Sequence, residues 1–230
     1  MSHVLVTGAN RGLGLEFTRQ LLVKGERVIA TCRQPGRAIE LTRLAGEHPG
    51  HLTVLPLTLP DARSIADLAR SIESLNLVIR MLINNAGLTI AGERFGTIEL
   101  EGLRTAFAAN AAGPLLLTQA LAPSLVDGAK VINLSSRLGS IALTDALYTP
   151  SYAISKSALN MASKLLSIAL AEQNGIVVAF SPGWVRTDMG GANAPLAATD
   201  SVASMLGVID GLRAEDRGKF LSHDGVEIPW

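Results

Sequence analysis

Several residue types that build common protein sites are scarce in this sequence. Its 230 residues include one cysteine, Cys32, which excludes an internal disulfide or a cysteine-based metal site and is typical of a reducing, cytoplasmic environment. None of the four histidines lies in a recognisable nucleophile setting and no GxSxG elbow occurs, which argues against a hydrolase. Twenty basic residues balance twenty acidic ones, so no net charge attracts nucleic acid or an anionic membrane. We expect no metal, no nucleic-acid partner and no membrane partner.

Long apolar runs are also scarce. The uncharged run at residues 105–126 is interrupted by polar residues, glycine and proline, and is interpreted as buried helix. Only three residues precede the first apolar run, so no export signal is indicated and a cytoplasmic location is expected.

Apolar segments are otherwise abundant, with 48% hydrophobic and 17% charged residues, and they alternate in type along the chain. Nearly continuous apolar runs, typical of strands covered on both faces, are separated by segments with helical spacing. The expected strands are residues 4–6, 27–32, 52–57, 78–83, 130–134, 176–180 and 219–221. This alternation predicts a single α/β domain over residues 1–230, doubly wound in the Rossmann manner, with about seven parallel strands flanked by helices on both faces.

A glycine-rich turn joins the first expected strand to the first expected helix. The residues are Thr7-Gly8-Ala9-Asn10-Arg11-Gly12-Leu13-Gly14, with GxxxGxG spacing. Glycines allow a sharp turn and close approach of a ligand, and the free amides of a helix start attract a pyrophosphate. This pattern predicts dinucleotide binding; a glycine turn without a ligand is the alternative.

The end of the second expected strand indicates which dinucleotide is favoured. An NAD site usually has an acidic residue there to bind the ribose hydroxyls, but this sequence has Cys32 and Arg33. Arg11 in the glycine loop and Arg33 could flank a 2′-phosphate, so NADP(H) is favoured over NAD(H). The alternative is that both arginines are ordinary solvated surface charges.

A tyrosine and a lysine stand four residues apart in a segment with strong helical composition. Thr149 is expected to cap this helix and Pro150 to be its first residue, which places Tyr152 and Lys156 on one face. A nearby ammonium is expected to lower the pKa of the Tyr152 phenol. Tyr148 has no lysine at the same spacing. An ordinary helix pair is the alternative reading.

Two polar clusters follow expected strands at the same edge of the sheet. Ser135 and Ser136 end one strand, and residues 84–87, with the sequence Asn-Asn-Ala-Gly, end another. Ligands bind at the carboxyl ends of strands in such sheets, although turn and capping hydrogen bonds explain both clusters equally well.

Taken together, these residues resemble the short-chain dehydrogenase/reductase superfamily over nearly the whole chain. The glycine loop, the Asn-Asn-Ala-Gly element, Ser136 with Tyr152 and Lys156, Asn110, and the Pro-Gly element at residues 181–187 match that family's motifs in order. The ending at residues 220–230 is similar to the C-factor/sniffer-type subgroup near carbonyl reductases. The resemblance implies a catalytic set of Asn110, Ser136, Tyr152 and Lys156.

The resemblance also implies a set of cofactor contacts. These are Gly8, Asn10, Arg11, Gly12, Leu13, Gly14, Arg33, Thr58, Leu59, Asn85, Ala86, Gly87, Tyr152, Lys156, Pro182, Gly183, Val185 and Thr187. Two departures from the family pattern stand out. Thr58-Leu59 replaces the usual Asp and apolar residue at the adenine ring, and the interval from Ser136 to Tyr152 is a few residues longer than usual, which leaves Ser135 as an alternative to Ser136.

The implied function is NADP(H)-dependent hydride transfer between a nicotinamide and a carbonyl or alcohol substrate, with Tyr152 as acid and base. The cofactor half would span about 1–130 and the catalytic and substrate half about 131–230, with a mobile loop at 186–199 as a lid. A homodimer or homotetramer is implied. A non-catalytic NADP(H)-binding regulator of the same fold is the alternative function.

Leu143, Leu147, Tyr148, Trp184 and Met189 are expected near the substrate pocket, where they would suit an apolar carbonyl compound. Packing of these residues against one another is the alternative.

Overall fold

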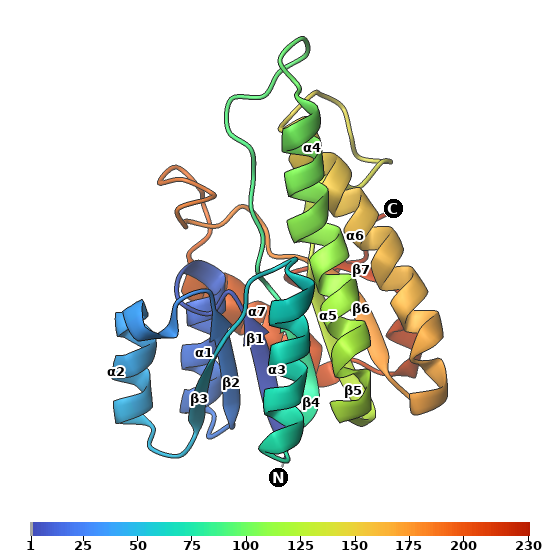
Figure 1. The fold of residues 1–230 in the computed structure, drawn as a ribbon. Helices are drawn as coiled ribbons and strands as arrows, with labels where there is room; N and C mark the ends of the chain where they lie inside the picture. Colours follow the sequence, from blue (N-terminus) through green and yellow to red (C-terminus); the bar gives the residue numbers. More distant parts are fainter. Residues whose placement is uncertain (1) are drawn as a thin grey trace.

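A parallel sheet of seven strands forms the centre of the computed structural model, which describes residues 2–230 (Figure 1). The strands are β1 (Ser2–Thr7), β2 (Val28–Cys32), β3 (Leu52–Pro56), β4 (Val78–Asn84), β5 (Leu125–Leu134), β6 (Ile176–Ser181) and β7 (Phe220–Ser222). Their order in the sheet is β3-β2-β1-β4-β5-β6-β7, and every pairing between them is parallel. The doubly wound α/β fold predicted from the sequence is confirmed.

Helices alternate with these strands along the chain. The α-helices are α1 (Gly12–Val23), α2 (Ile39–Glu47), α3 (Ala62–Ser74), α4 (Leu100–Phe107), α5 (Gly113–Leu121), α6 (Pro150–Ala169) and α7 (Ala198–Gly211). Shorter turns are η1 (Pro35–Arg37), η2 (Ala108–Ala112), η3 (Ala122–Ser124), η4 (Arg137–Gly139), η5 (Ala171–Gln173) and η6 (Ala214–Asp216). None of the helices in residues 2–230 is both long and apolar enough to cross a membrane.

Alternation of side chains along the central strands creates a hydrophobic core on each face of the sheet. In β1, Val4 and Val6 point to a core built with α1, α2 and α7, whereas Leu5 points to a core built with α3, α5 and α6. Because both faces are covered, the strands need continuous apolar sequences, which explains why the runs were recognisable.

The uncharged run at residues 105–126 is only partly the buried helix that the sequence predicts. It comprises the end of α4, the π-helical turn η2, α5, the short turn η3 and the first residues of β5. The pairing between β4 and β5 shifts register between Ile79 and Met81, so Leu125 already pairs with Ile79. The strand therefore begins at Leu125 and not at the predicted residue 130. Its first half has a less dense apolar pattern than its second half.

The segment at residues 186–199, predicted as a loop, is irregular up to the start of α7 at Ala198. Its last two residues therefore belong to a helix instead. Val185 and Leu196 form an isolated bridge, so the segment returns on itself above the sheet (Figure 1). Thr187, Asp188 and Met189 of this segment line one cleft together with residues that follow β1, β4 and β5 at the carboxyl edge.

Candidate active site

The main cleft lies at the carboxyl edge of the sheet, where the chain order reverses between β1 and β4. Its volume is about 490 Å³, a size typical of cofactor and small-molecule sites. The cleft is lined by Gly8, Asn10, Arg11, Gly12, Leu13, Cys32, Arg33, Leu57, Leu59, Asn85, Ala86, Gly87, Leu88, Thr89, Ala109, Leu134, Ser135, Tyr152, Lys156, Pro182, Thr187, Asp188 and Met189.

The glycine loop has the geometry needed to bind a phosphate. Gly8 and Gly12 have φ of 63° and 55°, a region that favours glycine, and α1 begins at Gly12 without a capping side chain. A Cβ on Gly14 would lie 2.4 Å from the Gly8 carbonyl oxygen, so only glycine allows this close turn. The amides at the start of α1 therefore face the cleft as donors for an anion.

The loop after β4 is bonded directly to the glycine loop. Asn85 Nδ2 donates to the Thr7 carbonyl oxygen (2.8 Å), and the Thr7 hydroxyl accepts the amides of Asn85 and Ala86 (3.0 Å each). These bonds hold the two strand ends at the switch point together.

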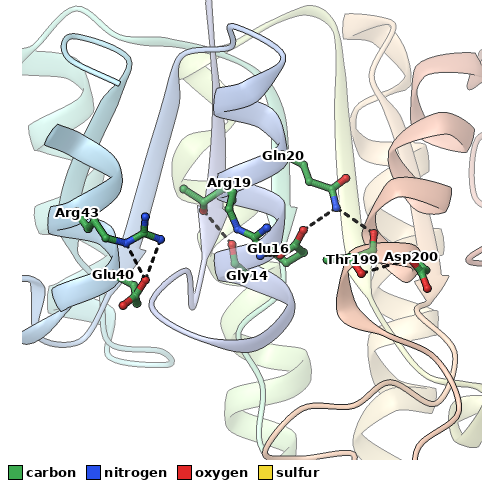
Figure 2. A network of polar contacts seen from close by, with 9 residues as sticks. Gly14, Glu16, Arg19, Gln20, Glu40, Arg43, Thr199 and Asp200 are labelled. Atoms are coloured by element: carbon green, nitrogen blue, oxygen red, sulfur yellow. Dashed lines mark hydrogen bonds and ion pairs between the residues drawn. The ribbon is translucent and has the colours of Figure 1, made fainter. Parts of the chain in front are cut away.

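A polar network braces α1 against the start of α7 (Figure 2). Gln20 Nε2 donates to Glu16 Oε1 (2.7 Å) and to the Thr199 carbonyl oxygen (2.9 Å). Glu16 is buried and forms an ion pair with Arg19. The helix that faces the phosphate site is thus tied to the helix that follows the 186–197 segment.

The two arginines that favour NADP(H) both reach the cleft. The Arg33 side chain forms no hydrogen bond or ion pair with any residue in the described range 2–230. Arg11 Nη1 instead pairs with Asp188 Oδ2 (2.9 Å), and both side chains are mostly exposed. The sequence carries no signal for this carboxylate beside one of the two guanidinium groups.

Lys156 and Tyr152 line the cleft together, and Ser136 lies next to Tyr152 without lining the cleft. The Lys156 ammonium nitrogen lies 5.5 Å from the centroid of the Tyr152 ring and donates to the Leu134 carbonyl oxygen (2.6 Å). Ser136 Oγ accepts the Leu138 amide (3.2 Å) and lies near the Tyr152 phenol, whereas Ser135 is buried and donates to Asn160 Oδ1 (2.6 Å). The position next to Tyr152 favours Ser136, whereas the lining of the cleft includes Ser135 and not Ser136, so both serines stay candidates.

Burial has opposite effects on the pKa values of the two titratable groups. It raises the pKa of Tyr152 above its ordinary value, and the hydrogen bond with Ser136 only partly opposes this rise. It lowers the pKa of Lys156 from 10.5 to about 8. The net lowering of the phenol pKa that was expected is not found for the protein alone, because desolvation of the phenolate outweighs any lowering by a nearby cation.

Asn110 lies in η2 and clamps the chain that follows β4. Its amide nitrogen donates to the Leu88 carbonyl oxygen (2.8 Å) and to Ser155 Oγ (2.9 Å), and its oxygen accepts the Leu88 amide (2.8 Å). A Cβ on Gly87 would lie 3.1 Å from Asn110 Oδ1 and 3.6 Å from Lys156 Nζ. A side chain at this position would therefore crowd both polar groups. Asn110 itself does not line the cleft.

The start of α6 differs from the capped helix that the sequence predicts. Pro150 is the first helical residue as expected, but Thr149 has φ of 39° and its hydroxyl is buried without a partner. The capping prediction for Thr149 is therefore wrong. Glu93 accepts the Ser151 amide instead (3.0 Å).

Some of the remaining predicted contacts line the cleft and others do not. Leu59, Pro182 and Thr187 line the cleft, whereas Gly14, Thr58, Ser136, Gly183 and Val185 do not. Thr58 is exposed and its amide donates to Ser64 Oγ (2.9 Å), while Val185 is buried against the bridge to Leu196.

Sequence reasoning missed several lining residues: Leu57, Leu88, Thr89, Ala109, Leu134 and Asp188. Leu57, Leu88, Thr89 and Leu134 follow or end strands β3, β4 and β5, so the rule that carboxyl ends meet at one edge could have found them. Asp188 carries no such signal.

Comparison with known proteins assigns the fold and site to a family. The family model described as short chain dehydrogenase matches residues 2–196, which is most of the chain. The chain belongs to the short chain dehydrogenase family. This membership makes it an oxidoreductase of Rossmann-type fold that uses a nicotinamide cofactor.

Individual members of the short chain dehydrogenase family are similar over much or all of the chain. The C-signal protein of Myxococcus xanthus is 42% identical over 154 residues, which cover 66% of this chain and 93% of that protein. The carbonyl reductase Sniffer of D. melanogaster has a TM-score of 0.94 at 32% identity, and both chains are covered completely. The NADPH-bound carbonyl reductase from chicken fatty liver has a TM-score of 0.93 at 38% identity over 100% of this chain and 99% of that one.

Proposed function

We propose that this protein is an NADP(H)-dependent oxidoreductase that interconverts a carbonyl group and an alcohol, with Tyr152 transferring the proton. The observation that carries the proposal is the position of Tyr152 and Lys156, which lie close together and line the cleft beside the glycine loop, with Ser136 next to Tyr152. When bound, the cofactor supplies or accepts the hydride. In reduction Tyr152 donates a proton to the substrate oxygen, and in oxidation it removes one.

The residues around the cleft fit a phosphorylated dinucleotide. The uncapped start of α1 and the glycines supply amides for the pyrophosphate, and Arg11 and Arg33 supply two cations for the 2′-phosphate. Asn10, Leu13, Leu59, Ala86, Gly87, Pro182 and Thr187 are proposed to contact the remaining parts, with Gly14, Thr58, Asn85, Gly183 and Val185 supporting them. The NADPH-bound carbonyl reductase from chicken supports this preference.

The other polar groups have distinct proposed roles. Ser136 orients the substrate oxygen from its position next to the Tyr152 phenol. Lys156 holds the ribose side of the site and places a positive charge near the phenol. Asn110 holds the backbone at Leu88 and the Ser155 hydroxyl, so it keeps the wall of the cleft beside Lys156 in place.

Loss of NADPH absorbance with a panel of aldehydes, ketones and quinones tests the proposal. We expect Tyr152→Phe to lower the turnover of an active substrate by about 10²- to 10⁴-fold, the usual contribution of an acid or base, and to leave NADPH affinity nearly unchanged. Near-normal turnover by the variant would refute the role of Tyr152. Faster turnover with NADH than with NADPH would refute the cofactor preference.

A second candidate is a regulatory protein that binds NADP(H) without turning over a substrate. The name of the Myxococcus relative, C-signal, favours this possibility. Tight NADPH binding without oxidation across the whole panel would support the regulator and contradict the reductase.

We extend the proposal to a cytoplasmic homodimer or homotetramer that forms through α4, α5 and α6. Large apolar side chains are exposed on these helices: Leu100, Phe107, Leu116, Ile154, Met161, Leu165 and Ile168. The molar mass in solution, measured by light scattering, tests it, and a monomer would contradict it. An apolar substrate is proposed because Met189 lines the cleft. Leu147, Tyr148 and Trp184 are exposed without lining the cleft, and Leu143 packs on Phe220 and Ile228.

A further inference from the structure

The first turn of α6 is capped by a residue far away in the sequence. Pro150 has no amide hydrogen and Thr149 provides no capping bond, so the Ser151 amide is the first donor of the helix. Glu93, 58 positions earlier, accepts this amide at Oε2 (3.0 Å) and accepts the Ser151 hydroxyl at Oε1. A carboxylate at this place is favoured by charge-assisted hydrogen bonds and by the helix dipole.

The capped residue directly precedes Tyr152. Ser151 is 1% exposed and Glu93 is half-buried, so the two bonds between them are partly shielded from competing water. On the other side of Tyr152, its carbonyl oxygen accepts the Ser155 hydroxyl (2.7 Å), which in turn accepts a bond from Asn110 (2.9 Å). The turn that carries the phenol is therefore anchored before Tyr152 by Glu93 and after it by Ser155 and Asn110.

Glu93 comes from the segment between β4 and α4 that also forms a wall of the cleft. Leu88 and Thr89 of this segment line the cleft, and Glu93 follows a few residues later. Its carboxylate thus joins the wall of the cleft to the helix of Tyr152.

The neighbouring helix leaves space for this carboxylate. A Cβ added to Gly102 in α4 would lie 3.2 Å from Glu93 Oε1 and 3.6 Å from Ser151 Oγ. Alanine at this position would crowd the carboxylate, although alanine is the better helix former.

We propose that Glu93 is a positioning residue that holds the first turn of α6 so that the Tyr152 phenol points at the reacting oxygen. The inference rests on the proposed carbonyl reduction, because it assigns Glu93 a role in that reaction. Glu93 does not line the cleft, and it acts through Ser151.

The experiment compares Glu93→Ala, Glu93→Gln and Gly102→Ala in the full chain, using the best carbonyl substrate. We expect Glu93→Ala to lower kcat by about tenfold or more with an unchanged KM for NADPH, because small displacements of a reacting group are costly. Glu93→Gln should restore most of kcat, since its amide oxygen can accept the Ser151 amide and its amide nitrogen can donate to the Ser151 hydroxyl. Gly102→Ala should lower kcat while leaving the melting temperature unchanged or higher.

Asp216→Ala is the matched control. The Asp216 carboxylate also accepts a backbone amide at the start of a short helix, from Arg213 (2.8 Å), but it lies near the amino end of β6. Asp216→Ala should lower the melting temperature without changing kcat. Loss of melting temperature with normal kcat in Glu93→Ala would make Glu93 a merely structural cap and overturn the inference.

Amide hydrogen exchange at residues 151–153 separates the inference from the proposed function. Faster exchange there in Glu93→Ala than in the wild type supports the anchoring even if no substrate in the panel is turned over. Unchanged exchange overturns it, whether or not Tyr152→Phe abolishes turnover.

Discussion

Replacing Lys156 with methionine is expected to stabilise the protein without cofactor, although it removes a proposed catalytic residue. Lys156 is 4% exposed, and burial lowers the pKa of its ammonium group from 10.5 to about 8. A change of this size corresponds to about 3 kcal/mol of unfavourable charge burial at neutral pH. Losing the hydrogen bond to the Leu134 carbonyl oxygen costs about 1 kcal/mol, so the free energy of unfolding should rise by about 2 kcal/mol.

The increase in the free energy of unfolding that we expect for Lys156→Met should become smaller as the pH rises. Between pH values of about 8 and 10.5 the unfolded chain keeps a proton on Lys156 that the folded protein has lost. The stability of the wild type therefore rises with pH over this window, because the unfolded state binds more protons there. The variant has no such group, so its advantage should be complete below pH of about 8 and should vanish near pH of about 10.

Urea denaturation of the cofactor-free protein at neutral and at alkaline pH measures this effect. Lys164→Met on the same helix is the control for replacing an exposed lysine by methionine. If Lys156→Met is less stable than the wild type at neutral pH, or if the difference is equal at both pH values, the reasoning is wrong.

Two further predictions concern residues that contact groups lining the cleft. A Cβ on Gly139 would lie 2.8 Å from the Lys156 carbonyl carbon, so Gly139→Ala should displace α6 and lower kcat by about 10- to 100-fold, as steady-state kinetics would reveal. Gly46→Ala, where nothing lies within 4 Å, is its control, and equal kcat values in the two variants would contradict the argument. Asp188→Asn removes the partner of Arg11 and should strengthen NADPH binding by up to about fivefold in calorimetric titration, since an exposed ion pair is worth at most about 1 kcal/mol. An equal gain for NADH would show that Arg11 does not distinguish the 2′-phosphate.

The fold was predictable because each local pattern had one dominant cause. Strands covered on both faces require continuous apolar runs, and all seven runs became strands in the parallel sheet. The beginning of β5 was missed because Asp127 and Gly128 interrupt its apolar pattern where the register shifts. The π-helical turn η2 was missed because the Ala-rich sequence around Asn110 is equally compatible with an ordinary helix.

The candidate site was predictable where its geometry is local and not where it is formed by distant segments. The spacing of Tyr152 and Lys156 within one helix places them together, and the glycine loop bends as its sequence suggests. By contrast, the Glu93 cap and the Arg11–Asp188 pair join positions 58 and 177 residues apart, for which a single sequence gives no signal. The prediction at Thr149 failed because that distant carboxylate took over the capping role.

The two titratable groups at the centre of the cleft share a single electrostatic environment. Desolvation penalises any charged form, so it keeps the proton on Tyr152 and makes the proton on Lys156 easier to lose. In the proposed reduction the phenol must arrive protonated, and the protein alone already favours that form. Oxidation instead requires the phenolate, which becomes accessible only when the Lys156 ammonium stays charged beside it, as it does below pH of about 8. In the proposed reaction, burial of the two groups therefore favours proton donation by Tyr152 over proton removal, and the charge on Lys156, whose burial costs stability, opposes this bias.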